Sequence, residues 1–350
     1  MLDRTILDRT ILDRTIGWES HSRTLSTALA AGLAAWLLAQ GTAVAQTELK
    51  FADALPKTFS YYNAMFAFKD AVEEKSKTLK ISVFGEGVLG DQKALMEGTK
   101  VGSIDISVVA SQVSQQFVPE HGVFGLPFVW VKEEDFRKFI EGPIALELGK
   151  KMEAHGLKVL KIVDVSPVGV LNSKRAVRTP DDMKGLKLRV MQDPMQVDVV
   201  KAMGGIPVPM GTTEVYTAIQ QGQIDGNATS AQLIWALKNH EVAKHYSDTK
   251  QSQSAAIIMM NLKKWTALTA EQKAALDEGG KAFLAKNREY YTTNPATSTA
   301  SVTAMMQKAG VTITEPDIEA FRKATAPIIV AFKQRMKSPL VDQALKEAGL

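Results

Sequence analysis

The chain has 350 residues, enough for about two domains of ordinary size, and 45% of its residues are hydrophobic, which is ample for a sizeable core. Its net charge of +4 is small and its lysines and arginines form no cluster, so we expect no nucleic-acid partner. The chain has no cysteine, which excludes disulfides, thiolate metal sites and a cysteine nucleophile.

The first 45 residues are typical of a targeting segment rather than of a folded domain. The repeat LDRTI fills residues 2–16, and Arg23 precedes an apolar run at 25–39. This run is shorter than the roughly 20 residues that a membrane-spanning helix needs, and Ala43-x-Ala45 follows it as a cleavage signal. We therefore predict a secretory signal peptide that is removed after Ala45. An N-terminal membrane anchor is the alternative.

The first predicted strand, at 49–54, is followed by a helix with apolar residues at helical spacing at 61–76. After the next strand, Gly85-x-Gly87-x-x-Gly90 resembles a dinucleotide-binding turn. Such a turn belongs in the first strand–helix unit, whereas this one comes after the second strand. Glu86 would also place a negative charge beside a diphosphate. We therefore expect an ordinary loop here, and no nicotinamide cofactor.

One local pattern occurs twice, at 79–109 and at 186–229. Each segment opens with a strand after Leu-Lys and continues with a helical run that ends in Gly-x-Ile-Asp, at 102–105 and at 222–225. The glycine suits the left-handed position after a helix, and we expect the isoleucine to start the next strand. Two such units predict an α/β protein with two lobes and a cleft between them.

The rest of the chain adds three elements. A buried strand is predicted at 155–165. A turn with a helical start follows at 178–185, where Thr179 can cap and Pro180 takes the first helical position. A long helical tract at 266–310 begins with Thr269 as N-cap, and Pro295 must kink or break it.

Arg189 lies near the end of the predicted strand GLKLRVM. Leu186, Leu188 and Val190 share one face of this strand, so Arg189 lies on the other face. The planar guanidinium matches a carboxylate with two parallel hydrogen bonds. From the strand alone, a surface arginine in a weak ion pair is the favoured alternative.

The segment DDMKGLKLRVMQDPMQVDVVKAMGGIPVPMGTTEVYTAIQQGQIDG resembles the central signature of the solute-binding proteins of tripartite ATP-independent periplasmic (TRAP) transporters, the DctP family. Further matches are GVLGDQKALMEGTKVGSIDI, VFGLPFVW and NLKKWTALTAEQKAAL, in the order of the family, so the resemblance covers essentially all of 47–350. In this family the carboxylate-binding arginine lies in the motif at 185–190, which makes it Arg189 here.

The resemblance implies a two-lobed periplasmic binding protein fold of class α/β, with an interlobe ligand cleft and one long helix spanning both lobes. We assign 46–166 plus 255–294 to lobe I and 167–254 plus 295–350 to lobe II. The implied function is that of a monomeric periplasmic receptor, which binds a small organic acid and delivers it to the small and large permease subunits. No chemistry, cofactor or metal is implied.

This sequence departs from the sialic-acid-binding members of the family at four positions. Gly169 stands where those members have a second arginine, and Ala110 where they have a glutamate. Thr229 replaces an asparagine and Thr212 replaces an aromatic residue. We therefore expect a single carboxylate clamp, with a monocarboxylate that has an apolar or aromatic body as the ligand.

Other polar residues in strand-to-helix loops could bond to a ligand hydroxyl, but loop capping explains them equally well. Together with Arg189, the candidate ligand-binding residues are Asp53, Ser111, Gln112, Gln192, Thr212, Asn227 and Thr229. Two alternatives remain open: a receptor for another type of transporter, and an exported enzyme with paired carboxylates. No catalytic motif such as G-x-S-x-G or H-E-x-x-H supports the enzyme.

Overall fold

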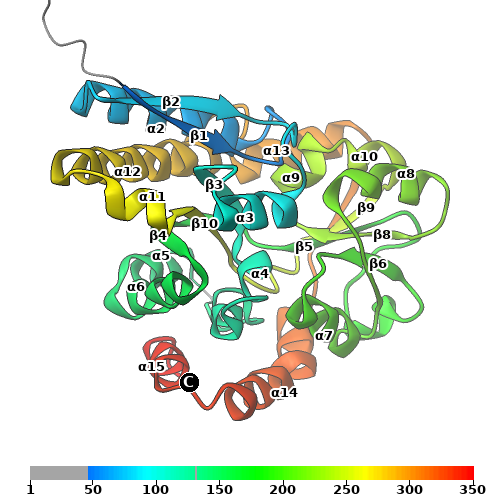
Figure 1. The fold of residues 1–350 in the computed structure, drawn as a ribbon. Coiled ribbons are helices and arrows are strands. Elements are labelled where there is room, and N and C mark those ends of the chain that lie inside the picture. Colours follow the sequence, from blue (N-terminus) through cyan, green and yellow to red (C-terminus); the bar gives the residue numbers. More distant parts are fainter. Residues whose placement is uncertain (1–45, 131) are drawn as a thin grey trace, which may run out of the picture. The chain divides into compact units, whose positions relative to one another are not determined.

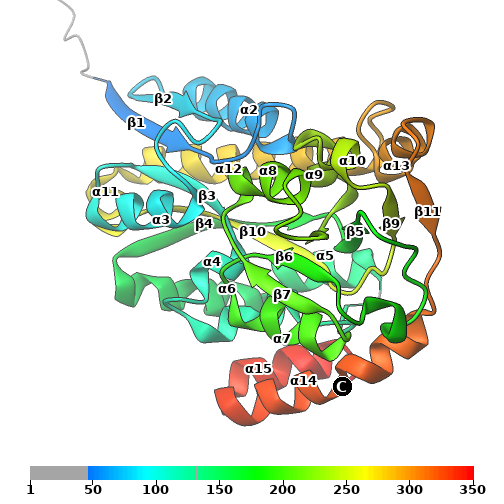
Figure 2. The same ribbon diagram turned by 90° about the vertical axis from the view of Figure 1, so that its right-hand side faces the viewer.

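The structure is a computed structural model in which residues 46–130 and 132–350 are described. The predicted signal peptide and its cleavage site lie outside these residues. Thr47–Leu350 form one compact unit, in which helices cover the faces of two β-sheets (Figure 1, Figure 2). Within the described part of the chain, no helix is long and apolar enough to cross a lipid bilayer.

The first sheet contains β1 (Thr47–Ala52), β2 (Leu79–Phe84), β3 (Ile106–Ala110), β4 (Leu157–Val165) and β10 (Ser254–Asn261). Their order is β2-β1-β3-β10-β4, with β1 parallel to β2 and β3, and β10 antiparallel to β3 and β4. Helices α2 (Ser60–Lys75) and α12 (Ala270–Thr292) cover one face. There Phe51 packs against Phe68 and Phe283, with ring centroids 4.9 and 6.1 Å away. Helix α3 (Gln92–Val101) packs on the other face.

The second sheet contains β5 (Gly169–Asn172), β6 (Lys187–Val190), β7 (Ile206–Pro209), β8 (Gly226–Thr229), β9 (His245–Ser247) and β11 (Thr312–Thr314). Their order is β11-β9-β5-β8-β6-β7, with β6 parallel to β7 and β8. Helix α7 (Pro194–Ala202) packs on one face. The other face is covered by α8 (Val215–Gln220), α9 (Ala231–Ala236) and α13 (Thr299–Lys308). As predicted, Leu188 and Val190 lie in the apolar core.

Three segments connect the two sheets: 166–168 between β4 and β5, 248–253 between β9 and β10, and 293–298 between α12 and α13. The first two segments are hydrogen-bonded to each other, because Val168 N donates to Ser252 O at 3.0 Å and Gln251 N to Val168 O at 3.1 Å. The chain therefore passes between the sheets on paired backbone segments.

The C-terminal helices α14 (Ile318–Met336) and α15 (Pro339–Glu347) pack on elements from different parts of the sequence. Helix α14 contacts α7, and α15 contacts α6 (Pro143–Lys150). The remaining elements are α4 (Ser111–Ser114), α5 (Glu133–Glu141), α10 (Asn239–Val242), α11 (Leu262–Ala267) and the 3₁₀ helices η1 (Pro119–Gly125), η2 (Lys151–His155), η3 (Pro180–Met183) and η4 (Thr212–Glu214).

The repeated Gly-x-Ile-Asp pattern has the same structural role in both halves of the chain. The glycines that follow α3 and α8 have φ angles of 88° and 71°, the left-handed conformation predicted after a helix. Each aspartate then bonds to the neighbouring parallel strand: Asp105 accepts from Lys50 N at 2.7 Å, and Asp225 accepts from Lys187 N at 2.8 Å. The Gly-x-Ile-Asp pattern therefore ends a helix and joins the following strand to its neighbour in the sheet.

The prediction that the isoleucine of this pattern starts each strand is wrong. Strands β3 and β8 begin at Ile106 and Gly226, one residue after the aspartates. The side chains of Ile104 and Ile224 are buried in the core ahead of each strand, and pairing with the adjacent strand begins at the aspartate that follows each of them.

The helical tract predicted at 266–310 is made of α12 and α13, preceded by α11. Thr269 caps α12 in a capping box with Gln272, as predicted. The chain leaves the helix at 293–298 around Pro295 and resumes at Thr299, so the predicted break is confirmed. The helical path thus consists of α12 on the first sheet and α13 on the second (Figure 1).

Gly85–Gly90 form the loop between β2 and α3. Gly87 and Gly90 have positive φ angles, and so does Glu86 at 61°, a conformation that favours glycine. A Cβ at Gly85 would lie 2.6 Å from the ring of Tyr62, so close packing against that ring requires glycine there. Strand β1 precedes β2 in the chain, as predicted, and β2 is an edge strand of its sheet.

Candidate ligand-binding site

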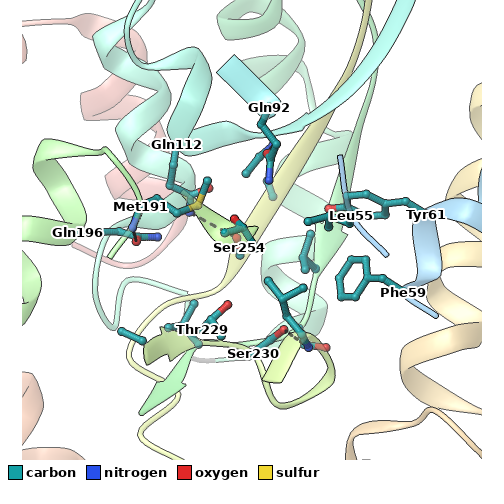
Figure 3. Close-up of a pocket in the computed structure, with 18 of the residues that line it drawn as sticks. Leu55, Phe59, Tyr61, Gln92, Gln112, Met191, Gln196, Thr229, Ser230 and Ser254 are labelled. Atoms are coloured by element: carbon teal, nitrogen blue, oxygen red, sulfur yellow. Dashed lines mark hydrogen bonds between the residues drawn. The ribbon is translucent and has the colours of Figure 1, made fainter. Parts of the chain in front are cut away.

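A buried pocket of about 50 Å³ is lined by residues that belong to both sheets and their connections (Figure 3). Several of them lie at strand ends: Ala110 ends β3, Val165 ends β4, Thr229 ends β8 and Met191 follows β6. Ligands of open α/β sheets gather at the carboxyl ends of strands. This pocket is therefore the candidate site.

The guanidinium of Arg189 is held in place by neighbours on its own sheet. Its Nε donates to the carbonyl oxygen of Met210 at 3.1 Å, and its Nη2 donates to Oγ1 of Thr212 at 3.0 Å. A guanidinium has five N–H groups, so the remaining donors are free to bind a ligand in the pocket that Arg189 lines.

Arg189 is a buried cation without a paired anion. Its exposed fraction is 2%, and it forms no ion pair with any carboxylate of the described residues. Burial lowers the pKa of Arg189 to about 10, and the negative charge of Glu214 opposes this shift. The side chain therefore stays charged at neutral pH. A buried charge is normally paired, so a site of this kind calls for an anionic ligand.

A second pocket of about 230 Å³ adjoins the first, and we call it the outer pocket because several residues that line it are exposed. The two pockets share six lining residues: Leu55, Gln92, Gln112, Arg189, Met191 and Thr212. The loop Gly85–Gly90 contributes Glu86 to the outer pocket, where Lys57 pairs with it at 2.9 Å. Arg189 thus lies on the wall common to both cavities.

One side of the buried pocket is apolar. Leu55, Phe59 and Tyr61 line it from the segment between β1 and the first turn of α2, and Leu233 of α9 lines it from the second sheet. Figure 3 shows the rings of Phe59 and Tyr61 next to each other beside Leu55; the two ring centroids are 5.0 Å apart in an edge-on arrangement. This wall can bury the hydrocarbon part of a ligand.

At Gly169, where the sialic-acid-binding members have a second arginine, the side chain of Tyr246 fills the space that another side chain would need. A Cβ at Gly169 would lie 2.4 Å from the hydroxyl oxygen of Tyr246 and 2.7 Å from its Cζ. Tyr246 is itself buried in the core of the second sheet. Any side chain at position 169 would have to displace this ring, so the strand β5 contributes no second cation to the site.

The structure brings together five of the eight predicted site residues. Arg189, Thr212, Gln112 and Thr229 line the buried pocket, and Gln192 lines the outer pocket. The other three predicted residues are buried but line neither pocket: Asp53, Ser111 and Asn227.

Each of these three has a physical reason to be elsewhere. Ser111 begins the short helix α4, and its hydroxyl is 3.5 Å from Oε1 of Gln112. Asn227 lies in the middle of β8, opposite Leu171 of β5 and Arg189 of β6. Asp53 follows β1 and is 1% exposed; burial raises its pKa to about 8, and the backbone amides of Leu55 and Ala54 oppose the shift. The prediction that these three residues bind the ligand stays a prediction, and neither of the two pockets is lined by them.

Sequence reasoning missed two glutamines of the buried pocket, Gln92 and Gln196. Both lie in the first turn of a helix that follows a strand of the sheets, α3 and α7 respectively. That position was the available signal, since polar side chains there are close to the carboxyl ends of strands.

Residues 51–335 match the family described as bacterial extracellular solute-binding protein, family 7, or DctP. The chain belongs to this family. It is therefore an extracytoplasmic solute-binding receptor of the type that serves TRAP transporters, as the resemblance predicted.

Individual relatives of the DctP family are similar along most of their length. The 2,3-diketo-L-gulonate-binding periplasmic protein YiaO of Escherichia coli is 30% identical over 296 residues, which cover 84% of this chain and 88% of that protein. A TRAP periplasmic solute-binding protein from Sulfitobacter sp. NAS-14.1 with bound β-D-galacturonate has a TM-score of 0.80 at 27% identity, covering 86% of this chain and 99% of that one.

A further TRAP periplasmic solute-binding protein, from Polaromonas sp. JS666 and bound to D-erythronate, has a TM-score of 0.79 at 28% identity and covers 86% of this chain and 98% of that one. These similarities confirm the two-lobed α/β fold. Receptors of this family work with membrane permease subunits, which are the partners that the resemblance implied.

Proposed function

We propose that this chain is the periplasmic receptor of a TRAP transporter that binds a small organic monocarboxylate through Arg189. The observation that carries the proposal is the burial of Arg189 in a pocket lined from both sheets, without a carboxylate partner among the described residues. Thr212 and Met210 orient its guanidinium, so the free N–H groups can bind a carboxylate in the geometry that arginine prefers.

The similar proteins support an organic acid as the ligand. One is named for binding 2,3-diketo-L-gulonate, and two solved structures hold galacturonate and D-erythronate. In this chain, Arg189 is the single charged side chain among the described residues of the buried pocket. Tyr246 occupies the space beside Gly169. One carboxylate is therefore expected at the buried pocket, with the rest of the ligand against Leu55, Phe59 and Leu233.

The proposal also includes export of the chain to the periplasm and binding of the ligand without a catalysed reaction. The apolar run at 25–39 and Ala43-x-Ala45 support cleavage after Ala45 and release of the mature chain into the periplasm. Family membership supports binding and delivery of the ligand without a reaction. The described residues contain no cluster of three metal-ligating side chains.

A thermal-shift screen of the mature chain, 46–350, tests this function. Each acid of a library of small monocarboxylates and dicarboxylates is compared with its neutral primary amide. A true ligand at one hundred times its Kd stabilises the fold by about 2.7 kcal/mol, and its amide should give no shift. A screen in which the amides stabilise the protein as strongly as the acids would contradict the proposal.

A further inference from the structure

Gln92 and Gln196 approach the buried pocket from helices on different sheets. Gln92 is the first residue of α3 and Gln196 is the third residue of α7, and both line the pocket together with Arg189. Figure 3 shows the two side chains entering the pocket from separate segments of the chain. Neither residue carries a charge, and both are half-buried.

Backbone hydrogen bonds fix the orientation of both amides. Ala110 N donates to Oε1 of Gln92 at 2.6 Å, and Met191 N donates to Oε1 of Gln196 at 3.0 Å. A backbone N–H can bond only to the oxygen of a side-chain amide, so the Nε2 group of each glutamine must be on the other side.

The two Nε2 groups have no acceptor among the described residues. Gln112, the third glutamine of the pocket, differs because its Nε2 is 3.4 Å from Oγ of Ser254. Two oriented amides therefore offer unused donors to the pocket.

The positive charge of Arg189 limits the ligand groups that the Nε2 groups of Gln92 and Gln196 can bind. No carboxylate among the described residues lines the buried pocket. A ligand ammonium would therefore be buried beside a cation and two donors, without an anion to pair with. A ligand oxygen that accepts hydrogen bonds satisfies the donors, whereas a hydrocarbon leaves them unpaired at a cost.

The acceptor oxygen is expected close to the carboxylate of the ligand. Met191, whose N–H donates to Gln196, directly follows β6, two residues after Arg189, and both residues line the buried pocket. Gln92 and Arg189 share the wall between the two pockets. All three residues line one pocket of about 50 Å³, so a ligand oxygen that the two amides reach lies near the carboxylate held by Arg189.

We infer that Gln92 and Gln196 determine ligand specificity by selecting acids that carry an oxo or hydroxyl oxygen next to the carboxylate, over acids with an ammonium or plain hydrocarbon at that position. This inference rests on the proposed function, because Arg189 must hold the carboxylate first. It names a ligand class: 2-oxo and 2-hydroxy monocarboxylates with an apolar body.

Four compounds with one carbon skeleton test the inference by calorimetric titration of the mature chain: 4-methyl-2-oxopentanoate, 2-hydroxy-4-methylpentanoate, 4-methylpentanoate and leucine. We expect the oxo or the hydroxy acid to bind at least tenfold more tightly than 4-methylpentanoate. Leucine should give no measurable heat of binding. Equal affinities for the oxo, hydroxy and plain acids, binding of none of them, or tight binding of leucine would each overturn the inference.

Variants separate a role in specificity from a role in structure. In Gln92→Leu and Gln196→Leu, the ratio of affinities for the oxo and plain acids should fall at least fivefold, while binding of the plain acid changes little. Gln343→Leu, on an exposed position of α15, is the matched control. Equal weakening of all acids in both pocket variants would show a structural role and contradict the inference.

The result that would contradict the proposed function differs from the result that would contradict only the inference. If it is wrong, Arg189→Ala binds these acids as well as the wild type does. If only the inference is wrong, Arg189→Ala still loses them all, but the wild type does not distinguish the oxygen-bearing acids from 4-methylpentanoate.

Discussion

At the scale of single residues, Arg189 and Asp53 are two almost completely buried ionisable side chains of opposite type. Arg189 is 2% exposed and Asp53 is 1% exposed. Burial acts against the charged form of both: it lowers the pKa of Arg189 to about 10 and raises the pKa of Asp53 to about 8. At pH 7 the arginine is charged and Asp53 is mainly protonated, so Asp53 does not neutralise the positive charge of Arg189.

The buried Asp53 should make the stability of the protein depend on pH. An unfolded aspartate has a pKa near 3.9, and the folded value is about 8, so the folded state binds more protons in between. Between about pH 4 and pH 8 the free energy of unfolding therefore falls as the pH rises, by up to about 1.4 kcal/mol per pH unit.

Urea unfolding of the wild type and Asp53→Asn at pH 5, 6, 7 and 8 measures this effect. The asparagine variant lacks the titration, so its stability relative to the wild type should increase steadily with pH. Asp135→Asn, at an exposed position of α5, should give no such trend. Parallel pH profiles for the wild type and Asp53→Asn would contradict the expected protonation of Asp53.

Residue-level prediction from the sequence was correct for the position of Arg189 in a strand and incomplete for its surroundings. Strand alternation placed Arg189 opposite the apolar face of Leu188 and Val190, whereas its role as the carboxylate ligand, taken from the motif, stays a prediction. Asp53 and Asn227 line neither pocket, because proximity to a strand end does not determine whether a side chain reaches the cavity. Gln92 was missed because its orientation depends on the N–H of Ala110, which only the fold brings close.

At the scale of elements, end signals in the sequence were reliable because they act locally. The capping box of α12 joins Thr269 and Gln272 through two hydrogen bonds, of 3.2 and 3.0 Å. The amide of Gln272 also donates to Oγ1 of Thr78 at 3.0 Å, next to the start of β2. This cap therefore connects the longest described helix to the edge of the first sheet.

Loss of this cap should destabilise the fold without affecting the pocket. Thr269→Ala removes the acceptor for Gln272 N, which typically costs about 1 kcal/mol. Thr269→Ser retains a hydroxyl and should restore most of it. Chemical unfolding of the three proteins gives the values, with ligand affinity measured alongside. A Thr269→Ala variant as stable as the wild type would show that α12 does not depend on its cap.

Element boundaries that depend on tertiary pairing were harder to predict. The two Gly-x-Ile-Asp segments were recognised as equivalent, but the strands begin after the aspartates, which bond to β1 and β6. The second segment also contains β7 and a second helix between its first strand and that pattern. Such pairing joins residues far apart in the sequence, so local patterns do not reveal it.

At the scale of the whole compact unit, the pocket is held at the connections between the sheets. Asp164, near the end of β4, is buried and pairs with Arg137 of α5 at 2.9 Å and with Arg288 of α12 at 2.7 Å. The chain then crosses to β5 through Val168, which is paired with the returning segment at Gln251. Helices of the first sheet thus fix the point where the chain crosses, while Arg189 belongs to the second sheet.

This arrangement explains why a carboxylate at Arg189 can join the two halves of the site. In the proposed function, the ligand carboxylate binds Arg189 of β6, and the apolar part of the ligand packs mainly against the segment around Phe59. Removing one partner of a buried charge pair typically costs about 2–5 kcal/mol, which corresponds to about thirty-fold to several thousand-fold in affinity. In the proposed function, Arg189 therefore contributes more to ligand affinity than any other residue of the buried pocket.

Calorimetric titration with the acid that gives the largest thermal shift tests this most directly, on the wild type, Arg189→Ala, Arg189→Lys and the exposed control Arg322→Ala. We expect Arg189→Ala to weaken binding by at least thirty-fold. Arg189→Lys should recover part of the loss, because lysine keeps the charge without the planar fork, and Arg322→Ala should bind as the wild type does. An Arg189→Ala variant that is folded and binds the acid within threefold of the wild type would contradict the assignment of Arg189 as the carboxylate clamp.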